Sequence, residues 1–165
     1  MITDSFLVAW PDYFDLVAEI NWTPPSPRDL VISGNLDEDA TAYFYSIVSR
    51  VDKTWWPYYI GMTYNQSVSL RLTQSDHLNR LALLTTEHPN RDFSISLGTP
   101  NFKVGRRDRR TIEAIEGLLI YSNWHESMIN DRKINRFFEA KQMYVRNVGW
   151  NEHVEPEAAY GVFYR

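Results

Sequence analysis

Hydrophobic and polar positions in the middle of the chain predict a hairpin followed by a helix. Residues 42–48 (AYFYSIV) and 55–63 (WWPYYIGMT) are rich in aromatic and β-branched residues, which is typical of strands. The short connection between them favours antiparallel pairing. Over residues 68–84, leucines recur at helical spacing, at positions 70, 78, 81 and 84. The pattern therefore indicates two strands and one helix in this order.

A third strand and a second helix follow. Residues 92–97 alternate between polar and apolar side chains, as a half-buried strand does, and Gly98-Thr99-Pro100 is expected to end it. Residues 109–122 have helical periodicity, with Asp108 as the N-cap. The other predicted elements are a helix over 5–20 broken near Pro11, a strand over 29–33, a helix over 131–138, and strands over 143–148 and 160–164.

These elements predict one α+β domain with a β-β-α-β-α core. At 165 residues the chain has the length of a single domain. We expect an acidic N-terminal extension at residues 1–40 that packs on or is linked to the core, a core at residues 41–148, and a C-terminal addition at residues 149–165.

Composition excludes several kinds of chemistry. The chain has no cysteine, which excludes disulfides, thiolate zinc sites, iron–sulfur clusters and cysteine nucleophiles. No apolar run reaches the ~18 residues of a membrane span, and the first residues do not resemble a signal peptide. We therefore expect a cytoplasmic protein that does not bind membranes.

Charge is divided unevenly along the chain. The formal net charge is −4, yet residues 42–148 contain fifteen Lys or Arg against ten Asp or Glu. Residues 1–41 contain eight acidic side chains and one arginine. The middle of the chain is therefore suited to an anionic partner, and ordinary scatter of surface charge is the alternative.

One acidic residue interrupts the apolar face of the helix predicted over 109–122. At 100° per residue, Glu116 falls between Ile112 and Ile120 on that face, whereas Glu113 falls at its polar edge. A buried carboxylate needs a cation or strong donors, and Mg²⁺ prefers oxygen ligands. We expect either a divalent cation at Glu116, or a structural role in which Glu116 pairs with Arg71 or reaches the rim.

Two tyrosines are expected to meet across the hairpin. Tyr43, Tyr45 and Ile47 share one face of the first strand, and Tyr59 and Gly61 share one face of the second. A glycine inside a strand indicates close approach by another group. The tyrosines are candidates for proton relay beside a cation and an arginine, and aromatic packing is the alternative.

Basic and aromatic side chains offer a path for a nucleic acid. Five basic residues lie just before or at the start of the helix that contains Glu116: Lys103, Arg106, Arg107, Arg109 and Arg110. Positive charges at a helix N-terminus oppose the helix dipole, and an anionic ligand bound there would offset this repulsion. A solvated charge run is the alternative. Near the hairpin turn, Lys53, Trp55 and Trp56 are expected either to stack on unpaired bases or to pack against the acidic N-terminal segment.

Taken in chain order, these residues resemble the motif series of the GIY-YIG nuclease family. The motifs are Tyr43-Phe44-Tyr45, Tyr59-Ile60-Gly61, Arg71, Glu116 and Asn130, within residues 42–131. The predicted order is similar to the family core, a small three-stranded, mainly antiparallel sheet flanked by helices.

The resemblance implies a role for each of five residues. Tyr45 would deprotonate the attacking water, Tyr59 would help to position it, and Arg71 would bind the scissile phosphate. Glu116 would bind Mg²⁺ or Mn²⁺, and Asn130 would order the site. The implied reaction is metal-dependent hydrolysis of phosphodiester bonds in DNA by in-line attack of water.

Some positions depart from the family pattern. Tyr43 stands where the first motif has glycine, and Met62 stands where some members have lysine. The proline that often precedes the asparagine is absent, so Asn123 and Asn135 are alternatives to Asn130.

The position of a further family residue is also shifted. Many members place His or Tyr one helical turn after the arginine, where this chain has Ser75, and the nearest histidine is His77. On one regular helix Arg71 and His77 would point about 120° apart. His77 is therefore a candidate site residue only if the helix begins late or bulges.

The sequence thus predicts a DNA endonuclease dependent on Mg²⁺ or Mn²⁺. One alternative is a catalytically weak or inactive nucleic-acid-binding module that keeps the fold and the basic surface. Another is a protein-interaction domain whose acidic flanks mimic or cover a nucleic-acid path. A homodimer would suit double-strand cleavage, because two sites must address two strands.

Overall fold

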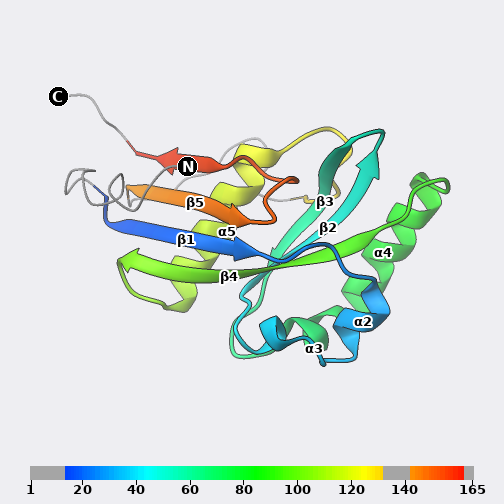
Figure 1. Ribbon diagram of the computed structural model, residues 1–165, viewed down its shortest axis with the longest axis horizontal. Coiled ribbons are helices and arrows are strands. Elements are labelled where there is room, and N and C mark those ends of the chain that lie inside the picture. Colours follow the sequence, from blue (N-terminus) through cyan, green and yellow to red (C-terminus); the bar gives the residue numbers. More distant parts are fainter. Residues whose placement is uncertain (1–13, 132–141, 162–165) are drawn as a thin grey trace.

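A six-stranded sheet organises the computed structural model, which describes residues 14–131 and 142–161 (Figure 1). The spatial order is β3-β2-β4-β1-β5-β6. Neighbouring strands are antiparallel except β1 and β5, which are parallel. The strands are β1 (Leu16–Trp22), β2 (Phe44–Val51), β3 (Thr54–Met62), β4 (Ser94–Val104), β5 (Met143–Gly149) and β6 (Glu157–Tyr160).

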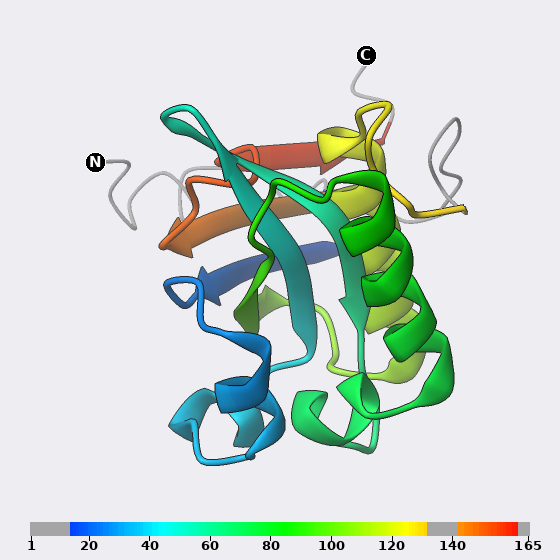
Figure 2. The same cartoon turned by 90° about the vertical axis from the view of Figure 1, so that its right-hand side faces the viewer.

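Helices cover both faces of this sheet. One face packs on α5 (Arg109–Asn123) through side chains such as Phe44, Ile60 and Ile115. The other face packs, through Tyr45, Ile47 and other residues, on α2 (Arg28–Ile32), α3 (Val68–Leu72) and α4 (Ser75–Glu87). The sheet is strongly twisted, and β2 and β3 run nearly across the direction of β1 and β5 in Figure 2.

The predicted α+β class is confirmed, although the sheet is larger than three strands. The strands predicted over 42–48, 55–63 and 143–148 correspond to β2, β3 and β5. The helix predicted over 109–122 is α5, and Asp108 caps it by accepting a hydrogen bond from the Thr111 N–H at 2.8 Å. The helix predicted over 131–138 falls almost entirely outside the described residues. The strand predicted over 160–164 overlaps β6 only at Tyr160. Residues 162–164 lie outside the described residues.

The prediction of a helix over 5–20 is wrong for the described residues. Residues 16–22 form β1, which lies between β4 and β5. Leu16, Ala18, Ile20 and Trp22 alternate along it and enter the core beneath α5. This two-residue period is the signal of a strand. Part of the acidic N-terminal region is therefore an inner strand of the sheet.

Two further predictions on local structure are wrong. The strand predicted over 29–33 is the short helix α2, which begins directly after Pro27. The strand predicted to end at Gly98-Thr99-Pro100 continues to Val104. The pairing of β2 with β4 ends at Gly98, so at Pro100 the strand β4 pairs only with β1 among the described residues. A proline is tolerated in a strand that has a partner on one side only.

The helix predicted over 68–84 is two helices. α3 ends at Leu72 and α4 begins at Ser75, after Gln74 in an extended conformation. The predicted leucine stripe is only partly buried, because Leu84 lies in the core whereas Leu70 and Leu78 are exposed. A short 3-10 helix, η1 (Asp37–Ala40), supports this region. Its Asp39 accepts hydrogen bonds from the backbone N–H and the hydroxyl of Ser69 at 2.8 and 2.6 Å.

Candidate active site

A cavity of about 480 Å³ lies beside β3, where residues of α3, α4 and α5 meet it. It brings together four of the residues predicted for the site, which are Tyr59, Arg71, Glu116 and Asn130. They belong to four separate segments of the chain. The complete lining is Tyr59, Met62, Arg71, Arg80, Glu113, Glu116, Ile120, Asn130 and Asp131.

Tyr45 and His77 form a buried cluster with Tyr59 and do not line the cavity themselves. The Tyr45 hydroxyl is 2.9 Å from Nε2 of His77, and the two side chains are almost fully buried. The ring centroids of Tyr45 and Tyr59 are 6.0 Å apart, and those of Tyr59 and His77 are 5.7 Å apart. The predicted meeting of the two tyrosines across the hairpin is confirmed.

The break between α3 and α4 brings His77 to this cluster. The expectation that Arg71 and His77 point about 120° apart assumed one regular helix. Because Thr73 and Gln74 separate two helices, α4 starts in a new direction and its first turn carries His77 onto the sheet. The structure thus brings His77 beside Tyr45, while Arg71 lines the cavity.

Burial controls the protonation of this cluster. Desolvation raises the pKa of Tyr45 well above its usual range, and the nearby Tyr59 raises it further. Desolvation and the charge of Arg71 lower the pKa of His77 to about 4. At neutral pH Tyr45 is protonated and His77 is neutral, so the phenol can donate its hydrogen bond to the Nε2 lone pair.

This arrangement predicts loss of stability in mild acid. In the folded chain the pKa of His77 is about 4 and that of His153, which is desolvated by burial, is about 3, whereas an unfolded histidine titrates near 6.5. The unfolded state therefore binds more protons below pH 6.5, and the free energy of unfolding falls as the pH drops from 6.5 toward 4. We expect a lower urea midpoint at pH 4.5 than at pH 6.5. His153→Phe should reduce this difference, and equal midpoints for the unmodified protein would contradict the prediction.

Gly61 makes room for the Tyr45 ring. A Cβ at position 61 would lie 2.5 Å from both Cζ and Oη of Tyr45 and 2.8 Å from Cε1 of Tyr59. Tyr45 and Gly61 are direct partners in the β2–β3 ladder. The close approach expected of a strand glycine is therefore that of the Tyr45 side chain.

Gly61→Ala is expected to destabilise the protein by about 1–3 kcal/mol through overpacking. The new methyl group would push Tyr45 away from His77, because the backbone of β3 is held in the sheet. Urea unfolding measures the cost. In a Tyr45→Leu background the same substitution should cost less, and an equal cost in both backgrounds would show that the methyl group acts elsewhere.

Asp76 holds two arginines at the cavity. It receives two hydrogen bonds from Arg71, at 3.2 and 3.0 Å, and one from Arg80 at 2.8 Å. Against the raising effect of desolvation, the bonds from Arg80 and Arg71 lower the pKa of Asp76 to about 2. Arg80 also lies over the ring of Tyr59, 4.9 Å from its centroid.

Asp76 and Arg80 are not among the residues predicted for the site. Their i,i+4 spacing on one helix is the signal that would have paired them. No sequence pattern indicates that Asp76 bonds Arg71, because this contact depends on the turn at Thr73 and Gln74.

Glu116 is half-buried on the wall of the cavity, as its place on the helix predicted. Its charge contributes to raising the pKa of Tyr59, after the larger effect of desolvation. Glu113 lines the same cavity one turn earlier and pairs with Arg109 at 2.8 Å.

These oxygens fit a hard divalent cation. The lining contains the carboxylates of Glu113, Glu116 and Asp131 and two guanidinium groups, so a cation would offset the excess negative charge. Among the described residues, no three carboxylate or imidazole groups converge closely enough to form a metal cage. Mg²⁺ does not require one, because it commonly binds one or two carboxylates and keeps several waters.

Asn130 ties the segment after α5 to the outer strand β3. Its Oδ1 accepts from the Ile60 N–H at 3.0 Å, and its Nδ2 donates to the Ile60 carbonyl at 2.8 Å. Asn123, one alternative, instead bonds Leu119 and the backbone of Glu155. Asn135, the other, lies outside the described residues.

The predicted basic segment is exposed between β4 and the first turn of α5. Arg107 donates to the Pro100 carbonyl at 3.0 Å and lies over the ring of Tyr43. None of the five predicted cations is among the residues that line the cavity. All five side chains, Lys103, Arg106, Arg107, Arg109 and Arg110, are exposed.

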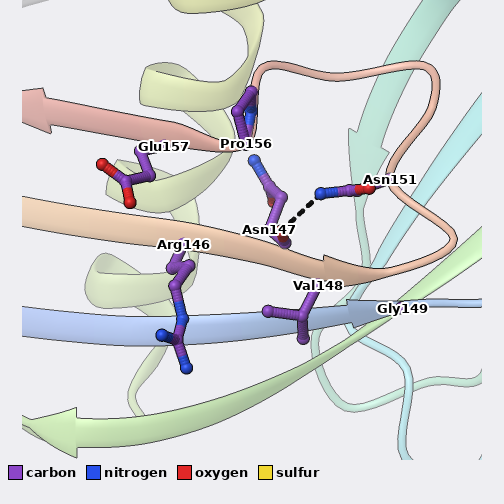
Figure 3. A pocket seen from close by; sticks show the side chains of 7 residues that line it. All are labelled: Arg146, Asn147, Val148, Gly149, Asn151, Pro156 and Glu157. Atoms are coloured by element: carbon purple, nitrogen blue, oxygen red, sulfur yellow. Dashed lines mark hydrogen bonds between the residues drawn. The ribbon is translucent and has the colours of Figure 1, made fainter. Parts of the chain in front are cut away.

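A separate cavity of about 380 Å³ lies beside β5 and β6 (Figure 3). Three of its polar side chains bond to the protein itself. Arg146 pairs with Glu19, Asn151 donates to the Asn147 carbonyl at 2.8 Å, and the Asn147 side chain bonds Trp22 and Glu155. This network supports the turn between the two strands, and we assign no reaction to it.

Comparison of the chain with protein-family models, curated proteins and solved structures gave no match. Within residues 14–131 and 142–161, none of the helices has the length and apolar character needed to cross a membrane.

Proposed function

We propose that this protein is a metal-dependent endonuclease of the GIY-YIG type that hydrolyses phosphodiester bonds of DNA. One observation carries the proposal. A single cavity is lined by Tyr59, Arg71, Glu116 and Asn130, which come from distant parts of the sequence and stand in the order of the family motifs.

The arrangement of the surrounding elements supports the proposal. Along the chain, the hairpin β2–β3 is followed by α3 and α4, then by β4 and α5. β2 lies between β3 and β4 and is antiparallel to both. This is compatible with a β-β-α-β-α nuclease core to which β1, β5 and β6 are added.

Arg71 and Arg80 would bind the scissile phosphate. Both guanidinium groups line the cavity, and Asp76 fixes their orientation from one side. Planar guanidinium donors suit phosphate oxygens, and they stabilise the negative charge that develops there in the transition state.

Tyr59 would contact the attacking water, because its side chain reaches the cavity wall whereas Tyr45 is fully buried. Tyr45 and His77 would support the Tyr59 ring from its buried side. With a pKa of about 4, His77 is neutral at pH 7 and too weak a base to take the proton of the attacking water, so its role would be to hold the Tyr45 hydroxyl. Asn130 would keep β3, and with it Tyr59, in position.

Glu116 would hold Mg²⁺ or Mn²⁺, with Asp131 as a nearby oxygen donor. When bound, such a cation would offset oxygen charge during in-line displacement at phosphorus.

A cleavage assay tests this function. The purified protein and Glu116→Ala are incubated with supercoiled, linear and single-stranded DNA and with RNA, in Mg²⁺, Mn²⁺ or chelator. We expect cleavage that requires the metal and is absent in the variant. Cleavage that survives in Glu116→Ala would refute the site assignment.

Two observations favour a second candidate, a nucleic-acid-binding module without activity. Tyr45 is fully buried, and Asp76 pairs with both arginines. This candidate predicts salt-sensitive nucleic-acid binding and no cleavage in any metal.

A further inference from the structure

A smaller cavity of about 280 Å³ lies where β3 begins and α5 ends. It is formed by the start of β3, the residues that close α5, and the loop before β6. Three tryptophans line it, Trp55, Trp56 and Trp124. The first two, Trp55 and Trp56, lie near the hairpin turn, and they pack on the rings of Trp150 and His125.

The indole rings at this cavity are unusually accessible. Trp56 is 42% exposed and Trp124 is 41% exposed, although tryptophan in a folded domain is mostly buried. Trp55 packs edge-on against Trp150, and Trp56 packs against His125. These contacts hold the rings of Trp55 and Trp56 in place at the wall of the cavity.

The charged groups of this cavity are acidic. Glu152 and Glu155 line it, and no lysine or arginine is among its lining residues within the described chain. Two histidines also line it, His125 and His153. His153 is stacked on Trp150 and, because burial lowers its pKa to about 3, it is neutral at pH 7. His125 bonds the Pro57 carbonyl through Nε2.

We propose that this cavity binds an alkylated ammonium group. Indole faces attract cations through their quadrupole and bind quaternary ammonium groups especially well, because such groups need no hydrogen bonds. Glu152 and Glu155 supply the matching charge. A nucleic acid is less suitable as an occupant, since its phosphates would approach two carboxylates without a cation among the lining residues. The proposal does not depend on the nuclease activity.

A fluorescence titration tests the proposal on the full chain. Choline chloride is added at constant ionic strength, and the emission of the six tryptophans is recorded. 3,3-Dimethylbutanol, which has the same shape without the charge, serves as the matched ligand. We expect a saturable change with choline and at least about tenfold weaker binding of the alcohol. Equal binding of the two ligands, or no saturable change with choline, would overturn the proposal.

Variants locate the site. Trp56→Leu and Trp124→Leu should abolish choline binding, and Glu152→Gln with Glu155→Gln should weaken it several-fold with little effect on folding. The control is Tyr121→Leu, because Tyr121 is an exposed aromatic residue of α5 that does not line the cavity. Unchanged binding in both the tryptophan and the glutamate variants would refute the site.

Two further ligands identify the source of the cation. A peptide with trimethyl-lysine that binds more tightly than choline would indicate a modified protein partner, and the reverse order would indicate a small molecule. Tighter binding of mononucleotides than of either would overturn the proposal in favour of base stacking.

Discussion

Replacing Glu116 by glutamine is expected to lower metal-dependent cleavage by about 10³-fold. Glutamine has nearly the same shape, so the half-buried wall of the cavity should stay intact while the charge that holds a divalent cation is lost. The initial rate of nicking of supercoiled DNA in Mg²⁺ and Mn²⁺ measures the effect, and a thermal unfolding curve verifies that the variant is folded.

Glu113→Gln provides the matched control. Its side chain lines the same cavity from the same helix, but it is 45% exposed and paired with Arg109. Since exposed ion pairs contribute little, its cleavage rate should stay within about threefold of the unmodified protein. Equal losses in the two variants would mean that the general charge of the cavity matters and that Glu116 has no special role.

Arg71→Met is expected to lower the rate of the chemical step by about 10²–10³-fold, because the developing charge on the phosphate would lose one of the two guanidinium groups at the cavity. Arg71→Lys should recover only part of the rate, since lysine keeps the charge but lacks the planar fork that also meets Asp76. Single-turnover cleavage at saturating protein separates this loss from weaker binding of DNA.

The control for Arg71 is Arg91→Met. Arg91 lies over the ring of Tyr58, 5.5 Å from its centroid, as Arg80 lies over Tyr59, but it does not line the cavity. We expect it to cleave at nearly the normal rate. If Arg71→Met weakened DNA binding and left the single-turnover rate unchanged, Arg71 would be a docking residue and would have no part in the chemistry.

Sequence reasoning could identify much of the candidate site because its residues sit on strongly patterned elements. Tyr59 and Gly61 belong to an aromatic strand, and Glu116 interrupts a clear apolar helix face. Arg71 and Asn130 came from the family resemblance, since neither residue is distinguished by a local pattern. In the structure, Tyr59, Arg71, Glu116 and Asn130 all line one cavity, at the positions that the sequence predicts.

The errors arose where tertiary contacts decide the local structure. No glycine or proline marks the break at Thr73 and Gln74, where the Thr73 hydroxyl donates to the Leu70 carbonyl at 2.7 Å and the next helix buries His77. Residues 16–22 were assigned to a helix because short apolar runs fit both periods. Their strand partners, β4 and β5, lie about 80 and 125 positions away in the sequence, so no local pattern could supply them.

The inner position of β1 also affects how the chain folds. Leu16 pairs with Met143, and Trp22 with Gly149, so β1 and β5 can pair only after the residues of β5 have left the ribosome. Until then β1 has a free edge on one side, and the half of the sheet that carries Tyr45 and Tyr59 can form first from nearby residues. Because these strands are far apart in the sequence, we expect their pairing to be a slow, late step of folding. Until it is complete, the partly built sheet is open to aggregation.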